Sequence, residues 1–224
     1  MARKLYSSEI YLSPSFAIKR FLGLRQKYGD KAALTKSEFK PEREAWITAV
    51  FLLGLGKLAG REFWLRPNNE DSAPDVITVS FAESDEGVVA QMQNVEIFEY
   101  ESHAETDLAG AIKNKLSGKA YPDDYILLCY VHSRAGETFS TKEIFEKVSR
   151  VDPKVSEVWV LSSILSPTSS EHVVFQAFPK YNVYKFDYLD ELKASRQREL
   201  IHTKKGFVKQ IEFVPMGKYI FKLP

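Results

Sequence analysis

The sequence has 224 residues, of which 44% are hydrophobic and 27% charged, and its formal net charge is +1. This composition is typical of a globular protein and excludes global disorder. The single Cys129 excludes a disulfide framework, and the apolar run around it favours a small buried residue over a nucleophile. The N-terminus lacks the apolar segment of a signal peptide, and no apolar run is long enough to span a bilayer, so we expect a cytoplasmic protein outside the membrane.

The charges are unevenly distributed along the chain. Residues 1–40 carry nine Lys and Arg residues against three acids, and residues 193–224 carry eight against two. Between Arg66 and Lys113 there are eleven acids and no basic residue. This distribution suits a metal-using enzyme that acts on a polyanion, or two halves that neutralise each other on folding. We expect a basic helical segment at 1–40, an α/β core at 41–190, and a basic helix end and hairpin at 191–224 packed on that core.

Hydrophobic periodicity predicts the elements in chain order, because a 3.6-residue period is typical of helices and alternation is typical of strands. The first half of the sequence predicts two helices, one at 16–28 and a buried one from Ser37 or Pro41 to Gly60. A short strand at 61–65 follows, and then a strand at 76–81, an acidic turn at 82–87 and a long strand at 88–100. The second half predicts a helix at 103–116, a buried strand at 125–132, a helix from Thr141, strands at 158–162 and 173–178, an extended segment at 179–187, a helix at 188–198 and a hairpin of 207–213 with 218–223. Residues 5–13 show only weak structure. A hairpin, a crossover helix and a buried strand in this order predict an α/β fold with a mixed sheet flanked by helices.

Four acids in or near the acidic region are candidates for a site. Alternation along the strand at 88–100 places Glu99 and Glu101 on one face, at the strand end, and Glu96 on the other. Like charges at such a position favour a bound cation. Asp75 precedes the first strand of the hairpin, and Glu44 lies in the first turn of the buried helix. Two or three carboxylates can hold Mg²⁺ or Mn²⁺, which supplies the nucleophile and the charge neutralisation that phosphodiester hydrolysis needs.

A simpler interpretation of the same acids remains open. Asp75, Glu99 and Glu101 could be solvated acids at strand ends, and Glu44 could stabilise the positive end of its own helix. His103 follows the acid pair closely and could be a ligand or a base. The histidines without ligand spacing are His132, His172 and His202.

In this order of elements the residues resemble the PD-(D/E)XK nuclease superfamily, over roughly residues 42–132. The resemblance is carried by an acid on a helix, Pro74-Asp75 before a strand, Glu99-Tyr100-Glu101 at the end of the hairpin, a helix and a buried strand. It implies a restriction-endonuclease-like core in which Asp75 and Glu99 hold Mg²⁺ or Mn²⁺ and Glu44 supports the ion. Glu101 stands where the family has its lysine. Some restriction enzymes of the family also have Glu there, and in other members the lysine lies on the next helix, which implies Lys113 or Lys115.

The resemblance therefore implies a metal-dependent nuclease that acts on DNA. Its expected ligands are Asp75, Glu99 and Glu101 with support from Glu44, and its water-positioning cation is Lys113 or Lys115. The alternative is a catalytically inactive nuclease-fold module that binds nucleic acid or a protein partner. Either function is compatible with a homodimer. A small-molecule enzyme ranks last because the sequence has no glycine-rich phosphate loop.

Overall fold

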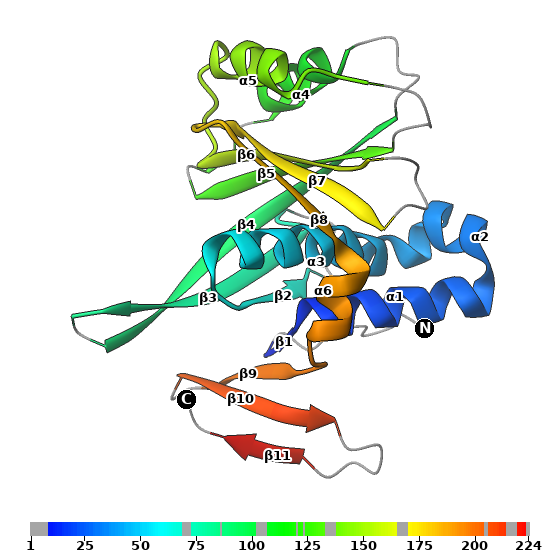
Figure 1. The fold of residues 1–224 in the computed structure, drawn as a ribbon, viewed down its shortest axis with the longest axis vertical. Coiled ribbons are helices and arrows are strands. Elements are labelled where there is room, and N and C mark those ends of the chain that lie inside the picture. Colours follow the sequence, from blue (N-terminus) through cyan, green and yellow to red (C-terminus); the bar gives the residue numbers. More distant parts are fainter. Residues whose placement is uncertain are drawn as a thin grey trace. The chain divides into compact units, whose positions relative to one another are not determined.

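The computed structural model describes residues 9–68, 73–85, 87–101, 107–119, 121–122, 124–132, 138–164, 170–203, 206–213 and 219–222. The chain divides into two compact units, which Figure 1 shows in sequence colours. The first unit comprises residues 1–92 and 190–224, and the second comprises residues 93–189. The first unit is therefore discontinuous and contains both of the basic segments. Within the described residues, no helix combines the length and the apolar character needed to cross a membrane.

The first unit combines helices with an antiparallel sheet. Its helices are α1 (Pro14–Tyr28), α2 (Asp30–Thr35), the 3-10 helix η1 (Ser37–Phe39), α3 (Lys40–Ala59) and most of α6 (Tyr188–Ala194). Its strands are β1 (Ile10–Leu12), β2 (Phe63–Pro67), β3 (Val76–Ser84), β9 (Glu199–Thr203), β10 (Gly206–Phe213) and β11 (Tyr219–Lys222), together with the first residues of β4 (Gly87–Glu101). The strand order in this unit is β11-β10-β9-β1-β2-β3-β4. The described pairs from β11 to β3 are antiparallel.

Helices α1 and α3 pack against each other in this unit, as their apolar faces predict. The rings of Phe21 and Trp46 stack with their centroids 5.1 Å apart. Pro14 begins α1, where a missing N–H costs nothing, and Gly60 ends α3 in the left-handed conformation. Both helices were predicted from sequence, and their positions are confirmed. A separate apolar cluster on the sheet joins β1, β2, β3 and β9 through Tyr11, Trp64, Val79 and Leu200.

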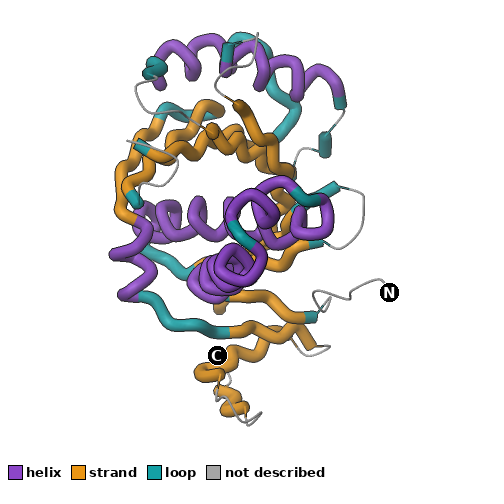
Figure 2. The backbone as a smooth tube through the Cα atoms, turned by 90° about the vertical axis from the view of Figure 1, so that its right-hand side faces the viewer, coloured by secondary structure: helices purple, strands orange, loops and turns teal. Residues whose placement is uncertain are grey.

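The second unit holds a mixed sheet flanked by helices. Its elements after β4 are α4 (Leu108–Gly118), β5 (Tyr125–His132), α5 (Thr141–Ser149), β6 (Glu157–Ser163), β7 (Glu171–Phe178) and β8 (Asn182–Asp187). The strand order is β4-β5-β6-β7-β8. β4, β5 and β6 are parallel, whereas β7 and β8 are antiparallel to their neighbours. Figure 2 shows α4 and α5 as purple coils over one face of this strand layer. The predicted α/β class with a mixed sheet and flanking helices is thus confirmed.

The structure corrects several predicted boundaries. Residues 10–12 form β1, where the sequence predicted only weak structure, and residues 199–203 form β9, for which no element was predicted. The helix predicted at 188–198 ends at Ala194. Helix α4 begins at Leu108 because the Asp107 carboxylate accepts a hydrogen bond from the Gly110 N–H at 2.7 Å, which caps the helix there. The first residues of the helix predicted at 103–116, up to 106, lie outside the described residues.

Candidate functional site

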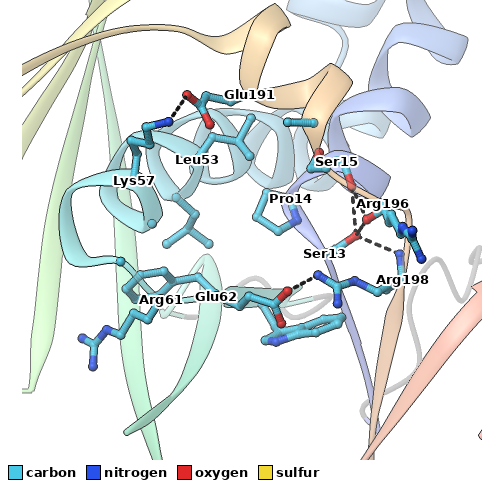
Figure 3. A pocket seen from close by; sticks show the side chains of 17 residues that line it. Ser13, Pro14, Ser15, Leu53, Lys57, Arg61, Glu62, Glu191, Arg196 and Arg198 are labelled. Atoms are coloured by element: carbon cyan, nitrogen blue, oxygen red, sulfur yellow. Dashed lines mark hydrogen bonds and ion pairs between the residues drawn. The ribbon is translucent and has the colours of Figure 1, made fainter. Parts of the chain in front are cut away.

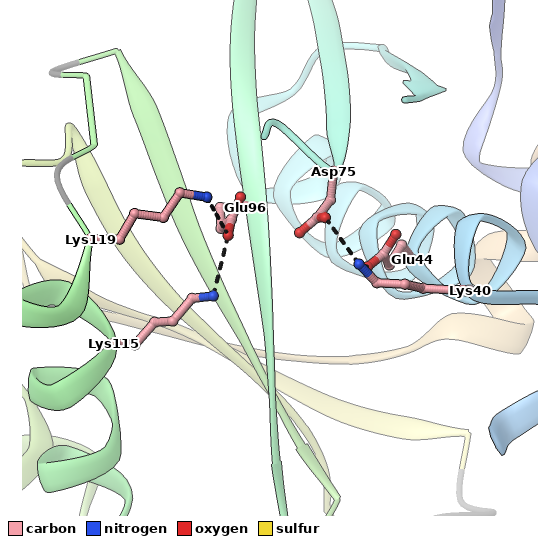
Figure 4. Close-up of polar contacts among 6 residues, drawn as sticks. All are labelled: Lys40, Glu44, Asp75, Glu96, Lys115 and Lys119. Atoms are coloured by element: carbon pink, nitrogen blue, oxygen red, sulfur yellow. Dashed lines mark hydrogen bonds and ion pairs between the residues drawn. The ribbon is translucent and has the colours of Figure 1, made fainter. Parts of the chain in front are cut away.

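Lys40, Glu44 and Asp75 form a charge cluster in the first unit, which we call the acid-rich cluster (Figure 4). Lys40 Nζ lies 3.2 Å from Glu44 Oε1 and 3.7 Å from Asp75 Oδ1. Glu44 is only 5% exposed, while the side chain of Lys40 is 56% exposed and approaches from solvent. The structure thus brings two of the predicted site acids, Glu44 and Asp75, to the same cation.

Local folding explains why these three side chains meet. Lys40 and Glu44 are four residues apart on α3, so they lie on one face of the helix. Asp75 directly precedes β3, and its carbonyl accepts a hydrogen bond from the Asn68 N–H at 2.8 Å. This bond continues the ladder of β2 and β3 by one pair and fixes the backbone of Asp75 beside the end of β2. The α3 helix contacts both β2 and β3.

The electrostatics of the acid-rich cluster favour an additional positive charge. Burial, with the neighbouring charge of Asp75, raises the pKa of Glu44 from 4.5 to about 7 although Lys40 and, more weakly, Arg43 oppose the shift. Partial burial by itself would lower the pKa of Lys40, but the carboxylates of Glu44 and Asp75 raise it above its usual value. With all three groups ionised the cluster carries a charge of −1. Either a proton on Glu44 or a further cation relieves the repulsion between the two acids.

Glu96 lies in a second cluster, here called the lysine-rich cluster, within the second unit. Glu96 Oε1 accepts hydrogen bonds from the ammonium groups of Lys115 and Lys119, each at 3.2 Å. Glu96 is 5% exposed and lies on the face of β4 opposite to Glu99, so α4 covers the Glu96 face. Lys115, a predicted water-positioning residue, is thus paired with Glu96, and Lys113 is exposed on the same helix. Their catalytic roles stay predictions.

Glu99 and Glu101 lie at the end of β4 in the second unit. Glu99 Oε2 is 2.8 Å from Nε2 of His132, the last residue of β5, and both side chains are partly exposed. The parallel register places Glu101, which is exposed, opposite His132. The predicted pair therefore lies on one face of β4, and the His132 imidazole lies beside Glu99. The predicted sharing of one ion by Asp75 and Glu99, which belong to different units, stays a prediction.

Two further sequence-based expectations concern reactive side chains. Cys129 is fully buried, and burial raises the pKa of its thiol far above the usual value, which confirms its interpretation as a buried apolar residue. His103 lies outside the described residues.

The acid-rich cluster fits a divalent ion better than the other groups do. The described part of the chain contains no group of three or more His, Cys, Asp or Glu side chains arranged to hold a metal. Mg²⁺ in phosphate-processing sites, however, is commonly held by one or two carboxylates together with substrate phosphates and water. Glu44 and Asp75 supply two carboxylates, and the ammonium of Lys40 shows that one cation can contact both.

Lys40 was not predicted from the sequence as a site residue, and His132 was considered there but not assigned to the site. The spacing of Lys40 and Glu44 was a usable signal, since a helix places residues four apart on one face. The contact of His132 with Glu99 depends on the parallel register of β4 and β5, which periodicity does not reveal.

Comparison with protein-family models, with curated proteins and with solved structures gives no match to this chain. Functional assignment therefore depends on the geometry of the described residues.

Proposed function

We propose that the chain is a divalent-metal-dependent nuclease that hydrolyses phosphodiester bonds in DNA and whose metal centre is built on Glu44 and Asp75. One observation carries the proposal: a buried carboxylate with a pKa of about 7 and a second carboxylate share a single cation. The order α3-β2-β3-β4-α4-β5 adds support, because a restriction-endonuclease-like core has a helix, a hairpin, a helix and a strand in this sequence.

The residues have distinct roles in this proposal. Glu44 and Asp75 would hold Mg²⁺ or Mn²⁺, which when bound lowers the pKa of a coordinated water and neutralises charge on the scissile phosphate. Lys40 supplies a positive charge for a phosphate oxygen of the substrate. Its exposed stem lets the ammonium leave the carboxylates without unfolding the helix.

Affinity for the nucleic-acid backbone is assigned to basic side chains away from the acids. Helix α1 carries the exposed Lys19 and Lys27, and the described part of the C-terminal segment carries the exposed Arg196. Each phosphate contact adds to the salt dependence of binding, so we expect the affinity for DNA to fall steeply with ionic strength.

A catalytically inactive module that binds nucleic acid or a protein partner is the second candidate. It is favoured by Lys40, which neutralises part of the acid-rich cluster without an ion, and by Glu101, which stands where the resembling family has its lysine. The two candidates differ in whether a divalent ion binds and whether the DNA is cut.

The decisive experiment combines cleavage with metal binding. Plasmid and single-stranded DNA are incubated with Mg²⁺ or Mn²⁺ and the native protein, Asp75→Asn, Glu44→Gln, or the control Glu38→Gln, an exposed acid on the preceding turn. We expect metal-dependent cleavage that Asp75→Asn lowers by more than about 100-fold, because even residues behind metal ligands contribute about 10- to 100-fold. Calorimetric titration with Mn²⁺ should lose its signal in Asp75→Asn and keep it in Glu38→Gln. If the protein binds DNA but neither cleaves it nor binds Mn²⁺, the inactive module is favoured.

A further inference from the structure

The first unit contains a pocket away from the acid-rich cluster, with a volume of about 620 Å³. Its walls come from the start of α1, the C-terminal half of α3, the turn into β2, and residues 191–198 (Figure 3). Pockets that bind small organic ligands have volumes of about 300 to 1,000 Å³, so this one has a suitable size. Neither Glu44 nor Asp75 lines it, so the pocket is separate from the acid-rich cluster.

The centre of the pocket is apolar and its two sides are charged. Leu53 and Pro14 lie at its centre in Figure 3, and the nearly fully buried Leu52, Phe63 and Trp64 also line it. On one side Lys57 Nζ pairs with Glu191 Oε1 at 3.3 Å. On the other side Arg198 pairs with Glu62, and the Arg198 guanidinium lies 5.3 Å from the centre of the Trp64 ring. An apolar body is therefore required of any ligand that fills the centre.

The side formed by Arg196 and Arg198 has an excess of positive charge. Arg198 shares Glu62, but its buried Nε has no hydrogen-bond partner within the described residues. The hydrogen bonds of Arg196 within the described residues are made by its main-chain carbonyl, so its guanidinium is available. Two guanidinium groups against one carboxylate leave a net charge of +1. Guanidinium groups bind oxyanions through charge-assisted hydrogen bonds.

The arginine side of the pocket is held in place by hydrogen bonds to the start of α1. The hydroxyl groups of Ser13 and Ser15 contact the Arg196 carbonyl at 3.2 and 2.7 Å. The Arg198 N–H donates to Ser13 Oγ at 2.9 Å, and the Ser13 N–H donates to the Arg198 carbonyl at 2.9 Å. These bonds join residues more than 180 positions apart, and the serines are buried. A preformed pocket lowers the entropy lost when a ligand binds.

We propose that this pocket is a binding site for a small aromatic oxyanion. Its flat apolar body lies against Pro14 and Leu53, and its phosphate or carboxylate is held by Arg196 and Arg198. Phosphate and carboxylate ligands of this kind share an anionic oxygen group on an apolar ring. The experiment below distinguishes between the two oxyanions.

The test is calorimetric titration of the full chain, with EDTA present so that the metal centre takes no part. The probes are phenyl phosphate, benzoate, inorganic phosphate and benzyl alcohol. We expect saturable binding of phenyl phosphate or benzoate, and the better of the two identifies the oxyanion. Inorganic phosphate lacks the ring and benzyl alcohol lacks the charge, so each should bind at least about tenfold more weakly.

Two variants and one control locate the binding. Arg196→Gln removes the available guanidinium and Ala194→Phe fills the pocket from its exposed wall, and each should weaken the preferred probe by about tenfold or more. Lys193→Gln removes an exposed charge outside the pocket lining and should bind like the native protein. The proposal is overturned if neither aromatic oxyanion saturates in the millimolar range. It is also overturned if inorganic phosphate binds as tightly, or if both pocket variants bind like the control.

Discussion

Glu44 and Glu96 are equally buried, each with 5% of its surface exposed, but the charges around them have opposite balance. Glu44 shares one lysine with a second acid, Asp75, whereas Glu96 alone receives two lysines. When ionised, the acid-rich cluster carries −1 and the lysine-rich cluster +1. The ratio of acids to lysines, and not burial, therefore separates a carboxylate that favours another cation from one that is already neutralised. Glu44 is part of a candidate site, whereas Glu96 with its two lysines stabilises the second unit.

The largest expected effect concerns the lysine-rich cluster. The double substitution Lys115→Met and Lys119→Met leaves Glu96 buried without a cation and should lower the free energy of unfolding by about 3 to 5 kcal/mol. Urea denaturation at neutral pH measures the loss. Lys113→Met, on the exposed side of the same helix, is the matched control and should stay within about 0.5 kcal/mol of the native protein. A loss below about 1 kcal/mol in the double variant would show that Glu96 is neutralised by other means.

The second effect is the pH dependence of stability that Glu44 confers. Its pKa is raised on folding from 4.5 to about 7, so its contribution to stability is fully present below pH 4.5 and is lost as the pH rises through 7. The loss across this window should be about 2 to 3 kcal/mol, since each pKa unit corresponds to about 1.4 kcal/mol. Glu44→Gln cannot ionise and should remove that part of the pH dependence. Denaturation curves for both proteins between pH 4.5 and 8 compare them, and identical slopes would contradict the assignment to Glu44.

The third effect is stabilisation by a divalent ion, which the acid-rich cluster should show. At an ion concentration ten times the Kd, Mn²⁺ should add about 1.4 kcal/mol to the free energy of unfolding at pH 8. The stabilisation should be smaller at pH 5.5, where Glu44 is mostly protonated, because a carboxylate must be ionised to bind the ion. Thermal denaturation with and without Mn²⁺ measures it. Asp75→Asn should abolish the difference, and an unchanged response in that variant would place the ion elsewhere.

The smallest effect is expected at the contact between Glu99 and His132. Both side chains are partly exposed, so water solvates either group when the other is removed. His132→Gln should change the free energy of unfolding by less than about 1 kcal/mol. The same denaturation assay applies, with His202→Gln, an exposed histidine in the first unit, as the control. A cost as large as that of the lysine double variant would mean that Glu99, like Glu96, is structurally neutralised.

The elements that sequence predicted well are those whose pattern is contained within their own residues. The strand at 125–132 has the predicted bounds because it is apolar throughout, and the buried helix ends at Gly60 as its glycine indicated. β1 and β9 were missed because three- and five-residue strands have little pattern of their own. They form because they pair with each other across most of the chain; β1 also pairs with the distant β2, and β9 with the adjacent β10.

In the candidate site, too, the features set by local patterns were predicted and those set by packing between elements were not. Glu44 and Asp75 were predicted as acids of one site, and their proximity follows from a helix and a strand start that local patterns locate. Lys40 was missed although its spacing to Glu44 was visible in the sequence. The neutralisation of Glu96 by α4 and the contact of Glu99 with His132 depend on packing and strand register between elements, which single-sequence patterns do not contain.

The discontinuity of the first unit sets an order for folding during synthesis. β1 is made before the second unit, whereas its partner β9 and the Arg196 carbonyl that Ser13 and Ser15 contact are made after it. The second unit, residues 93–189, is complete before those residues leave the ribosome. Long-range pairings form slowly, and nascent domains fold as they emerge. The second unit can therefore fold before the two segments of the first unit, residues 1–92 and 190–224, pair with each other. The pocket beside Arg196 consequently cannot form until the segment that follows the second unit has been made.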